Sequence, residues 1–325
     1  MLTLHPPGEP GASLTPEQLR AGLWIDLLDP TAEEIALVQS ALGVELPTRS
    51  EMHEIEVSSR LYTEGDVIFM TATVIQKADA AFPEVTPVTF VLAPATLITI
   101  RYGTPTPFRT FTAKCDRPGT PFSSRDKMFG GLMDEIIDRV ADILELAGAE
   151  LDAISRIIFN IPGHHGGGAP SNGPKPNYTA ILERIGRCGD LAGKARESLL
   201  SLARVVAFFI EIIRVKAPQE LDEHWRTVRS DISSLTEHAN FVSSKVNFFL
   251  DATLGMINIE QNTIIKIFSI AAVVFLPPTM IASIYGMNFD FMPETSWALG
   301  YPWALALMIV SAVLPVWYFK RKGWL

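Results

Sequence analysis

The sequence contains little cysteine and no excess of basic residues. Its 325 residues include two cysteines, Cys115 and Cys188, and the formal net charge is −9. The two cysteines lack the spacing of metal ligands, so we expect buried, reduced thiols without a functional role. A nucleic-acid partner requires a basic face against its phosphates. The acidic balance argues against that class of partner and suits a protein that handles cations.

Motifs of the common enzyme classes are also absent. There is no phosphate-binding loop and no Gly-x-Ser-x-Gly elbow, and His53-Glu54 lacks the second histidine of a zinc-protease helix. The paired His164 and His165 lie in a segment rich in glycine and proline, residues 162–176, where zinc would lack fixed third and fourth ligands. We therefore expect a loop there, no enzyme, and no resident cofactor.

The long uncharged runs of the chain lie at its carboxyl end. Ile267–Tyr285 holds no charged residue over 19 positions and Leu299–Phe319 holds none over 21. Each could cross a hydrocarbon core of about 30 Å. The amino-terminal residues lack the apolar segment of a signal peptide, so membrane insertion is expected to rely on these runs. The pattern predicts transmembrane helices at 265–285 and 299–319.

Flanking charge predicts the orientation of this hairpin. Lys266 borders the first run, and the tail 320–325 begins with three basic residues, whereas the loop 286–298 contains no Lys or Arg. Basic residues concentrate on the cytoplasmic side of membrane proteins. Both termini are therefore expected in the cytoplasm.

The remaining sequence predicts an α/β cytoplasmic domain followed by helices. Residues 1–125 carry strand signals, and Thr31 and Glu34 form a capping box at the start of a helix. The expected strands are Leu23–Leu28, Val67–Ile75, Val88–Leu92 and Thr96–Tyr102, the last two forming a hairpin. Region 126–218 is expected to hold two helices, Asp126–Ile161 and Tyr178–Lys216, around the loop 162–176. A very long helix should follow from about Gln219 to Tyr285, with 219–264 as a cytoplasmic stalk.

Two stripes can be followed along the long helix at alternating steps of four and three. The first is an apolar packing seam: Leu221, Trp225, Val228, Ile232, Leu235, Ala239, Val242, Val246, Phe249, Thr253 and Met256. The second, called here the polar stripe, is small or polar at most positions and continues through the first membrane run: Asp251, Gly255, Asn258, Asn262, Ile265, Ser269, Ala272, Leu276, Thr279 and Ser283.

The polar stripe predicts that several copies of the chain meet around an axis. Hydrocarbon offers no partner to amides and hydroxyls, so these groups should face protein or water. Two spans cannot enclose such a stripe within one chain, and copies of the first span could line a shared aqueous path. Dry helix packing is the alternative, because small residues also mark such contacts. Asn258 and Asn262 are bulky for tight packing and favour a wet lining.

The residues between the two runs carry a resemblance to a known family. Tyr285-Gly286-Met287-Asn288, followed by Met292-Pro293-Glu294 and Gly300-Tyr301-Pro302, resembles the signature of the CorA family of magnesium channels. The similarity extends from about Asn258 to the basic tail and is greatest to the enterobacterial branch. The amino-terminal body is similar more loosely, as at Trp24-Ile25-Asp26-Leu27.

The resemblance implies a homopentamer in the inner membrane, surrounded by lipid, with a funnel-shaped cytoplasmic domain and the second span outside the first. It implies inward flux of Mg²⁺, with Co²⁺ and Ni²⁺ as lesser substrates, driven by the membrane potential. Gly286, Met287 and Asn288 would form the outer mouth, with Asp251 at the cytoplasmic end of the path. The pore lining implied between them is Asn262, Ile265, Phe268, Ala272, Leu276 and Thr279.

The chemistry of Mg²⁺ fits these residue types. Mg²⁺ gives up its water reluctantly, so a ring of Asn288 carbonyls could accept hydrogen bonds from the hydrated ion. Asp290 and Glu294 in the outer loop would concentrate cations, although both could be ordinary solvated charges. Leu276 and Phe268 are hypothesised to close the path by excluding water. Some relatives have methionine where Leu276 stands.

Regulation is expected to differ in its residues. Some family members bind intracellular Mg²⁺ through an aspartate near the start of the long helix, where this chain has Thr227. Nearby carboxylates could replace it: Asp222, Glu223 and Asp231, or Asp134, Glu135, Asp138 and Asp142 on the preceding acidic helix. The hypothesis is that Mg²⁺ bridges acidic faces between subunits and holds the pore shut, because its removal leaves like charges that repel.

Two alternatives remain. A zinc transporter of the ZntB type shares the Gly-Met-Asn signature, but the polar stripe lacks the His and Cys ligands that zinc favours. A membrane-anchored scaffold is possible in principle, but it gives no reason for the amides and hydroxyls of the polar stripe.

Overall fold

The computed structural model describes residues 1–5, 15–80, 82–117, 122–159, 176–216, 223–287 and 297–324. The chain divides into two units, unit 1 from Met1 to Leu250 and unit 2 from Asp251 to Leu325. Some residues singled out from the sequence lie outside the described ranges: His164, His165, Leu221, Asp222, Asn288, Asp290, Met292, Pro293 and Glu294.

A six-stranded mixed sheet forms the centre of unit 1, in the order β1-β2-β6-β5-β4-β3. Strands β2 and β6 run parallel, and every other neighbouring pair is antiparallel. The strands are β1 (Leu2–His5), β2 (Trp24–Leu28), β3 (Leu61–Glu64), β4 (Val67–Gln76), β5 (Glu84–Leu92) and β6 (Leu97–Arg101).

The predicted hairpin is confirmed by the antiparallel pairing of β5 with β6. Strand β5 begins at Glu84, four residues before the expected start, and includes Pro87. Pro87 pairs with Thr73 of β4, whereas the pairing with β6 begins only at Val88. Proline has no backbone N–H to donate to a neighbouring strand, so it is tolerated at a position where the strand on one side is missing.

Short helices connect these strands. The capping box predicted at Thr31 and Glu34 opens α2 (Ala32–Leu42), with both reciprocal hydrogen bonds formed. Several other short elements were not predicted from the sequence: the edge strands β1 and β3, and the helices α1 (Pro16–Ala21), η1 (Glu51–His53), α3 (Val57–Arg60) and α4 (Thr106–Cys115).

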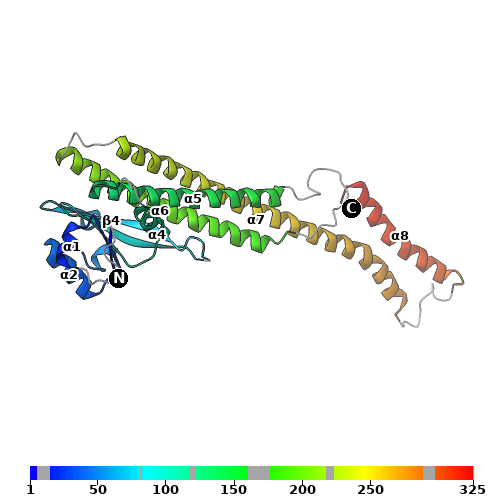
Figure 1. Cartoon of the computed structure of the whole chain (residues 1–325). Helices are drawn as coiled ribbons and strands as arrows, with labels where there is room; N and C mark the ends of the chain where they lie inside the picture. Colours follow the sequence, from blue (N-terminus) through cyan, green and yellow to red (C-terminus); the bar gives the residue numbers. More distant parts are fainter. Residues whose placement is uncertain are drawn as a thin grey trace. The chain divides into compact units, whose positions relative to one another are not determined.

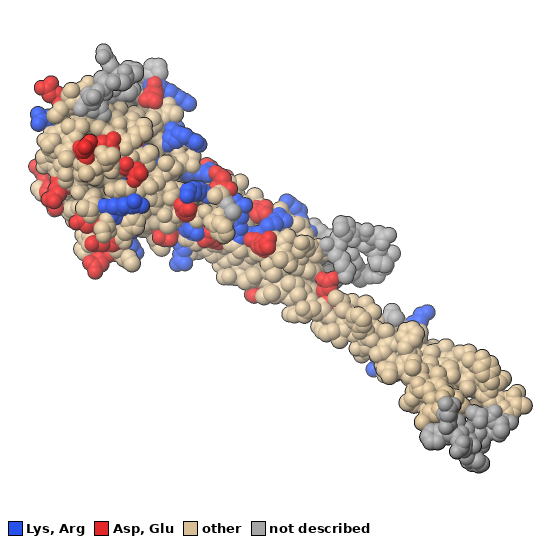
Figure 2. All heavy atoms as spheres, turned by 90° about the horizontal axis from the view of Figure 1, so that it is seen from below, with Lys and Arg blue, Asp and Glu red and all other residues tan. Residues whose placement is uncertain are grey.

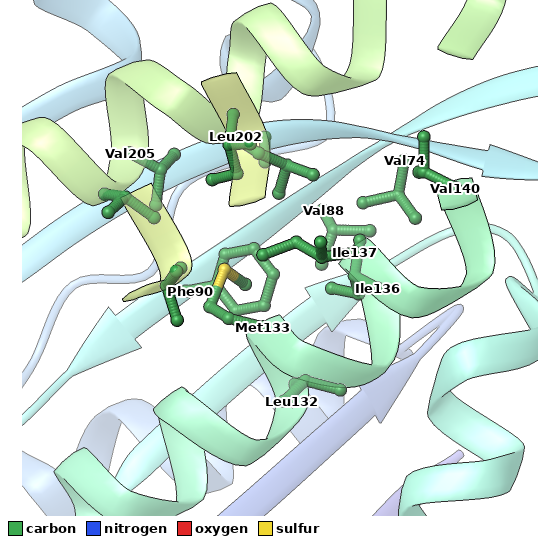
Figure 3. Packing of buried hydrophobic residues seen from close by; sticks show 14 of the residues in the cluster. Val74, Val88, Phe90, Leu132, Met133, Ile136, Ile137, Val140, Leu202 and Val205 are labelled. Atoms are coloured by element: carbon green, nitrogen blue, oxygen red, sulfur yellow. The ribbon is translucent and has the colours of Figure 1, made fainter. Parts of the chain in front are cut away.

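The two faces of the sheet are covered by different helices. Ile25, Leu27 and Val38 belong to one buried cluster, beneath α1 and α2. On the other face, Trp24 packs with Phe108 of α4 in a larger cluster that also includes α5 and α6. Figure 3 shows part of this second core, with side chains of β4, β5, α5 and α6 in contact. Alternate residues of β2 thus enter two separate cores.

Two long helices pack together beside the sheet (Figure 1). They are α5 (Arg125–Phe159) and α6 (Tyr178–Lys216), and the bounds of α6 agree with the prediction. The long helix α7 (Glu223–Tyr285, 63 residues) is also confirmed. Its apolar seam is buried at most of its described positions in unit 1, and Trp225 stacks on Phe129 of α5 with ring centres 5.4 Å apart.

Both cysteines are free thiols. Cys188 is buried as expected, whereas Cys115 is only half-buried. Burial raises the pKa of each thiol to about 11. Neither is therefore a reactive thiolate at neutral pH.

Unit 2 contains the end of α7 and the helix α8 (Gly300–Arg321), and both are long and apolar enough to cross a membrane. Figure 2 shows charged side chains over unit 1 and few on the visible face of unit 2. Helix α8 ends in a Schellman motif, in which Gly323 has a positive φ of 67° and the Trp324 amide donates to the Phe319 carbonyl.

Candidate functional site

Every position of the polar stripe is exposed in the single chain. The apolar members are exposed as well: Ile265 is 61% exposed and Leu276 is 66% exposed. Phe268, which lies beside the stripe, is 72% exposed. The row is therefore free to face other copies, water or lipid.

Helical geometry separates this stripe from the face that meets α8. Between residues 266 and 285, the side chains that are at least partly buried are Lys266, Ile270, Ala271, Val274, Pro277, Pro278, Ile281 and Tyr285. Successive residues of an α-helix are rotated by about 100°. The partly buried row and the row Ser269, Ala272, Leu276, Thr279 and Ser283 consequently lie on roughly opposite sides of α7. Figure 1 shows α8 running beside this part of α7.

The amides of the stripe are its most informative groups. Asn258 and Asn262 are exposed, and neither has a side-chain hydrogen bond within the described ranges. Thr279 differs, because its hydroxyl donates to the Phe275 carbonyl of its own helix at 2.7 Å. A hydroxyl satisfied in this way can face lipid at little cost, whereas a carboxamide has two donors and an acceptor to satisfy. The asparagines therefore need water or another chain.

The motif after α7 is described only at its beginning. The Gly286 amide still donates to the Ala282 carbonyl at 2.9 Å, so the helical pattern persists for one residue beyond Tyr285. Met287 is 48% exposed. Asn288 and the loop acids Asp290 and Glu294 lie outside the described residues, and their roles stay predictions.

Two adjacent prolines interrupt the hydrogen bonding of α7 next to the stripe. Pro277 and Pro278 lie inside the helix, and a proline has no N–H to donate to the carbonyl four residues earlier. The carbonyls of Val273 and Val274 therefore lose their usual donors. Both are within one turn of Leu276, where the helix is consequently easier to bend.

Comparisons with known proteins identify the family. A family model described as CorA-like Mg²⁺ transporter protein matches residues 20–321. The chain belongs to this family. CorA-like proteins are transporters, so the protein is not an enzyme, and with its two apolar helices it is an integral membrane protein.

Curated relatives include enterobacterial CorA proteins, as the resemblance predicted. The magnesium transport protein CorA of Yersinia pseudotuberculosis is 36% identical over 309 residues, covering 95% of this chain and 94% of the relative. That of Escherichia coli K12 is 35% identical over 303 residues, covering 93% and 92%.

Solved structures share the CorA fold. The complete CorA of Methanocaldococcus jannaschii has a TM-score of 0.71 at 20% identity, covering 93% of this chain and 91% of that one. A ZntB cytoplasmic domain from Vibrio parahaemolyticus has a TM-score of 0.51 at 10% identity, covering 72% and 87%. The first likeness covers both units, and the second covers less of the chain.

The carboxylates considered for regulation lie on α5 and at the start of α7. Burial raises the pKa of Asp138, and the charges of Glu135, Asp142 and Asp231 of α7 raise it further. Burial also raises the pKa of Asp134, which lies 3.6 Å from His224 of α7. Glu223 is exposed, and Thr227 donates to the Glu223 carbonyl.

These carboxylates do not form a metal site within one chain. Among the described residues, no group of three or more His, Cys, Asp or Glu side chains is arranged to hold a metal ion. A site built from this acidic region therefore requires ligands from a second chain or from residues outside the described ranges.

The contact of His224 with Asp134 was not anticipated from the sequence. The one sequence feature that could have suggested this contact is the position of His224, directly before Trp225 of the apolar seam, which is buried. The seam fixes which side of α7 meets α5, and this places His224 beside the acidic helix.

Proposed function

We propose that the protein is a homo-oligomeric channel for Mg²⁺, with copies of α7 lining the conduction path. The supporting observation is the polar stripe, which is exposed, carries unpaired amides at Asn258 and Asn262 among the described residues, and lies opposite the face toward α8. Family membership adds that curated relatives are magnesium transport proteins. The proposal takes a pentamer as the assembly, with α8 outside the ring.

In this proposal the ion enters from outside the cell as a hydrated cation. Gly286, Met287 and Asn288 form the mouth, and the Asn288 carbonyls accept hydrogen bonds from the water shell. Neutral acceptors suit this step, because carboxylates would hold a divalent ion too tightly for rapid release. Asp290 and Glu294 raise the local concentration of cations.

The apolar positions of the path act as its gate. Leu276 and Phe268 expose large apolar side chains, 66% and 72% of their surfaces, and a ring of such side chains excludes water from a narrow passage. Pro277 and Pro278 weaken the helix next to Leu276. A small bend there would widen the ring without breaking the rest of α7.

Intracellular Mg²⁺ closes the path in this proposal. Burial and, after it, the repulsion of neighbouring carboxylates raise the pKa of Asp138, and a divalent cation would relieve the repulsion if two subunits present such faces to each other. Asp222, Glu223 and Asp231 are the candidate ligands. Both termini lie in the cytoplasm of a cell whose inner membrane holds the hairpin.

Co²⁺ and Ni²⁺ are proposed as lesser substrates. A mouth that binds the ion through hydrogen bonds to its coordinated water discriminates weakly among hydrated divalent ions of similar size. A zinc transporter is less well supported. The ZntB likeness concerns a cytoplasmic domain at 10% identity and shows the fold alone, and the stripe contains no His or Cys.

The test is Mg²⁺ flux into liposomes that contain the purified protein, with and without an imposed inside-negative potential. Flux that increases with the potential supports the proposal. Asn262→Leu should reduce flux at least about tenfold while the assembly keeps its size, because the change removes a hydrated lining group. Phe241→Leu is the matched control, since Phe241 is an exposed residue of α7 outside the stripe. Equal flux through all three proteins would refute a path along the stripe.

A further inference from the structure

The molecule contains a cavity of about 400 Å³ in the α/β body, far along the sequence from the membrane helices. Its lining includes Thr3 of β1, Leu28 at the end of β2, Arg101 at the end of β6, and the first turns of α4. This size falls within the usual range for small-molecule sites, about 300–1,000 Å³. We propose that it binds a small phosphorylated metabolite, of about the size of a nucleoside monophosphate.

The position of the cavity in the fold supports a binding site. Strands β2 and β6 are the parallel pair of the sheet. After β2 the chain passes to the face covered by α2, and after β6 it passes to the opposite face covered by α4. Ligands of open α/β sheets bind beyond the carboxyl ends of neighbouring parallel strands whose connections diverge in this way. Leu28 and Arg101, the last residues of the two strands, both line the cavity.

The polar part of the lining is rich in donors. Arg101 and Arg109 contribute guanidinium groups, and threonine side chains supply hydroxyls. The lining formed by the described residues contains no carboxylate. A phosphate monoester has three terminal oxygens that accept hydrogen bonds from several directions, so it suits a set of convergent arginines and hydroxyls. The threonines of the lining are Thr3, Thr104, Thr106 and Thr112.

Arg101 is a fixed part of this site. It is 8% exposed and bonded through Nε and Nη2 to Asp26, with an Nη2–Oδ2 distance of 2.7 Å. Its Nη1 donates to the Gly103 carbonyl at 2.8 Å. These bonds use three of the five N–H groups of a guanidinium, which leaves two for a ligand. The side chain is thus held in place before a ligand arrives.

Arg109 supplies the charge that Arg101 cannot. Asp26 neutralises Arg101, whereas Arg109 is exposed on α4 and has no ion pair within the described ranges. The apolar wall includes Met1, Leu28, Pro105 and Phe108. A ligand with a phosphate at one end and a small apolar or aromatic body at the other would contact both parts of the lining.

The experiment measures binding to the full-length protein in detergent, by calorimetry, with AMP, inorganic phosphate and adenosine as probes. AMP should bind and adenosine should not, because the phosphate meets both arginines. Arg109→Gln should weaken AMP binding at least about tenfold, the usual effect of losing a charge-assisted hydrogen bond. Arg117→Gln is the matched control, since Arg117 is exposed on the segment after α4 and does not line the cavity.

Each result decides the proposal. AMP binding that is lost in Arg109→Gln and retained in Arg117→Gln supports it, and weaker binding of inorganic phosphate with the same dependence on Arg109 supports it further. Failure of both AMP and phosphate to bind at millimolar concentration overturns it, as does equal binding of adenosine or equal weakening by the two variants. Mg²⁺ flux is not part of this readout, so failure here leaves the channel proposal intact.

Discussion

The ammonium group of Lys266 on α7 lies 5.5 Å from the centre of the Trp324 ring, beyond the end of α8. The Trp324 ring also stacks on the ring of Phe319, with ring centres 5.5 Å apart and an interplanar angle of 10°. The Schellman motif at Gly323 turns the chain back and creates both contacts. The last residues of the chain therefore tie the two helices of the hairpin together at one end.

Gly323→Ala should loosen this connection. A residue with a Cβ is disfavoured at the φ of 67° found at Gly323, at a cost of about 1–2 kcal/mol. Amides in the last turn of α8 should then exchange with deuterium several times faster, measured by mass spectrometry on the full-length protein. Gly323→Asn is the control, because asparagine tolerates this conformation better. Identical exchange in all three proteins would contradict the importance of the turn.

Acid should destabilise unit 1 through His5. His5 is 3% exposed and stacks on Trp24 with ring centres 4.5 Å apart. Burial lowers its pKa below the usual 6.5, although Asp116 and Asp26 oppose the shift. The unfolded chain therefore binds a proton below pH 6.5 that the folded chain does not, and stability is lost as the pH falls, by at most about 1.4 kcal/mol per pH unit.

The measurement is the thermal unfolding midpoint at pH 7.5 and pH 5.5. In His5→Phe the ring can still stack on Trp24 but does not titrate. The fall in midpoint between the two pH values should be smaller in this variant than in the parent protein. A variant with the same or a larger fall would show that His5 is not the responsible group.

Removing one partner of the ion pair between Asp26 and Arg101 should destabilise unit 1. Thr99 donates to Asp26 at 2.7 Å and accepts a hydrogen bond from the Trp24 indole at 2.9 Å, so the pair belongs to a buried network. Asp26→Asn leaves Arg101 charged and without its partner, and should cost about 3–5 kcal/mol in the free energy of unfolding.

Denaturant unfolding of the full-length protein measures this cost. The double variant Asp26→Asn with Arg101→Leu is the control, since removing both charges should recover much of the stability. A single variant as stable as the parent protein would argue against a network of this strength.

Asn288→Ala distinguishes a pore from an anchor. If the carbonyl of Asn288 accepts hydrogen bonds from hydrated Mg²⁺, its loss should reduce flux about tenfold or more. The oligomer should keep its size on gel filtration, because Asn288 lies outside both uncharged runs of the sequence. Unchanged flux would favour a hairpin that only anchors the chain.

Local patterns in the sequence predicted the long elements accurately. The bounds of α6 agree with the prediction, the capping box at Thr31 opens α2, and the apolar seam of α7 is buried where it meets α5. These signals depend on residues within a few turns of one another. Short edge strands give weaker signals, and β1 and β3 have four residues each, so they were missed.

The candidate pore was predicted as a row of residues, and the structure added its relation to α8. The spacing of Asn262, Ser269 and Thr279 is readable from the sequence. The structure shows which side of α7 is partly buried, and helical geometry places that side roughly opposite the polar stripe, with α8 running beside this part of α7 (Figure 1). The residues of the mouth from Asn288 onward stay predictions.

The sequence by itself determined the two apolar spans, the polar stripe along the long helix and the family signature, because hydrophobic length and helical period are properties of neighbouring residues. Only the tertiary structure decided that Arg101 meets Asp26, 75 residues away in the chain, and that Thr3 and Arg109 share one cavity. Pairings of this kind arise when β1, β2, β6 and α4 pack together. They depend on which distant segments meet, and no local pattern records that.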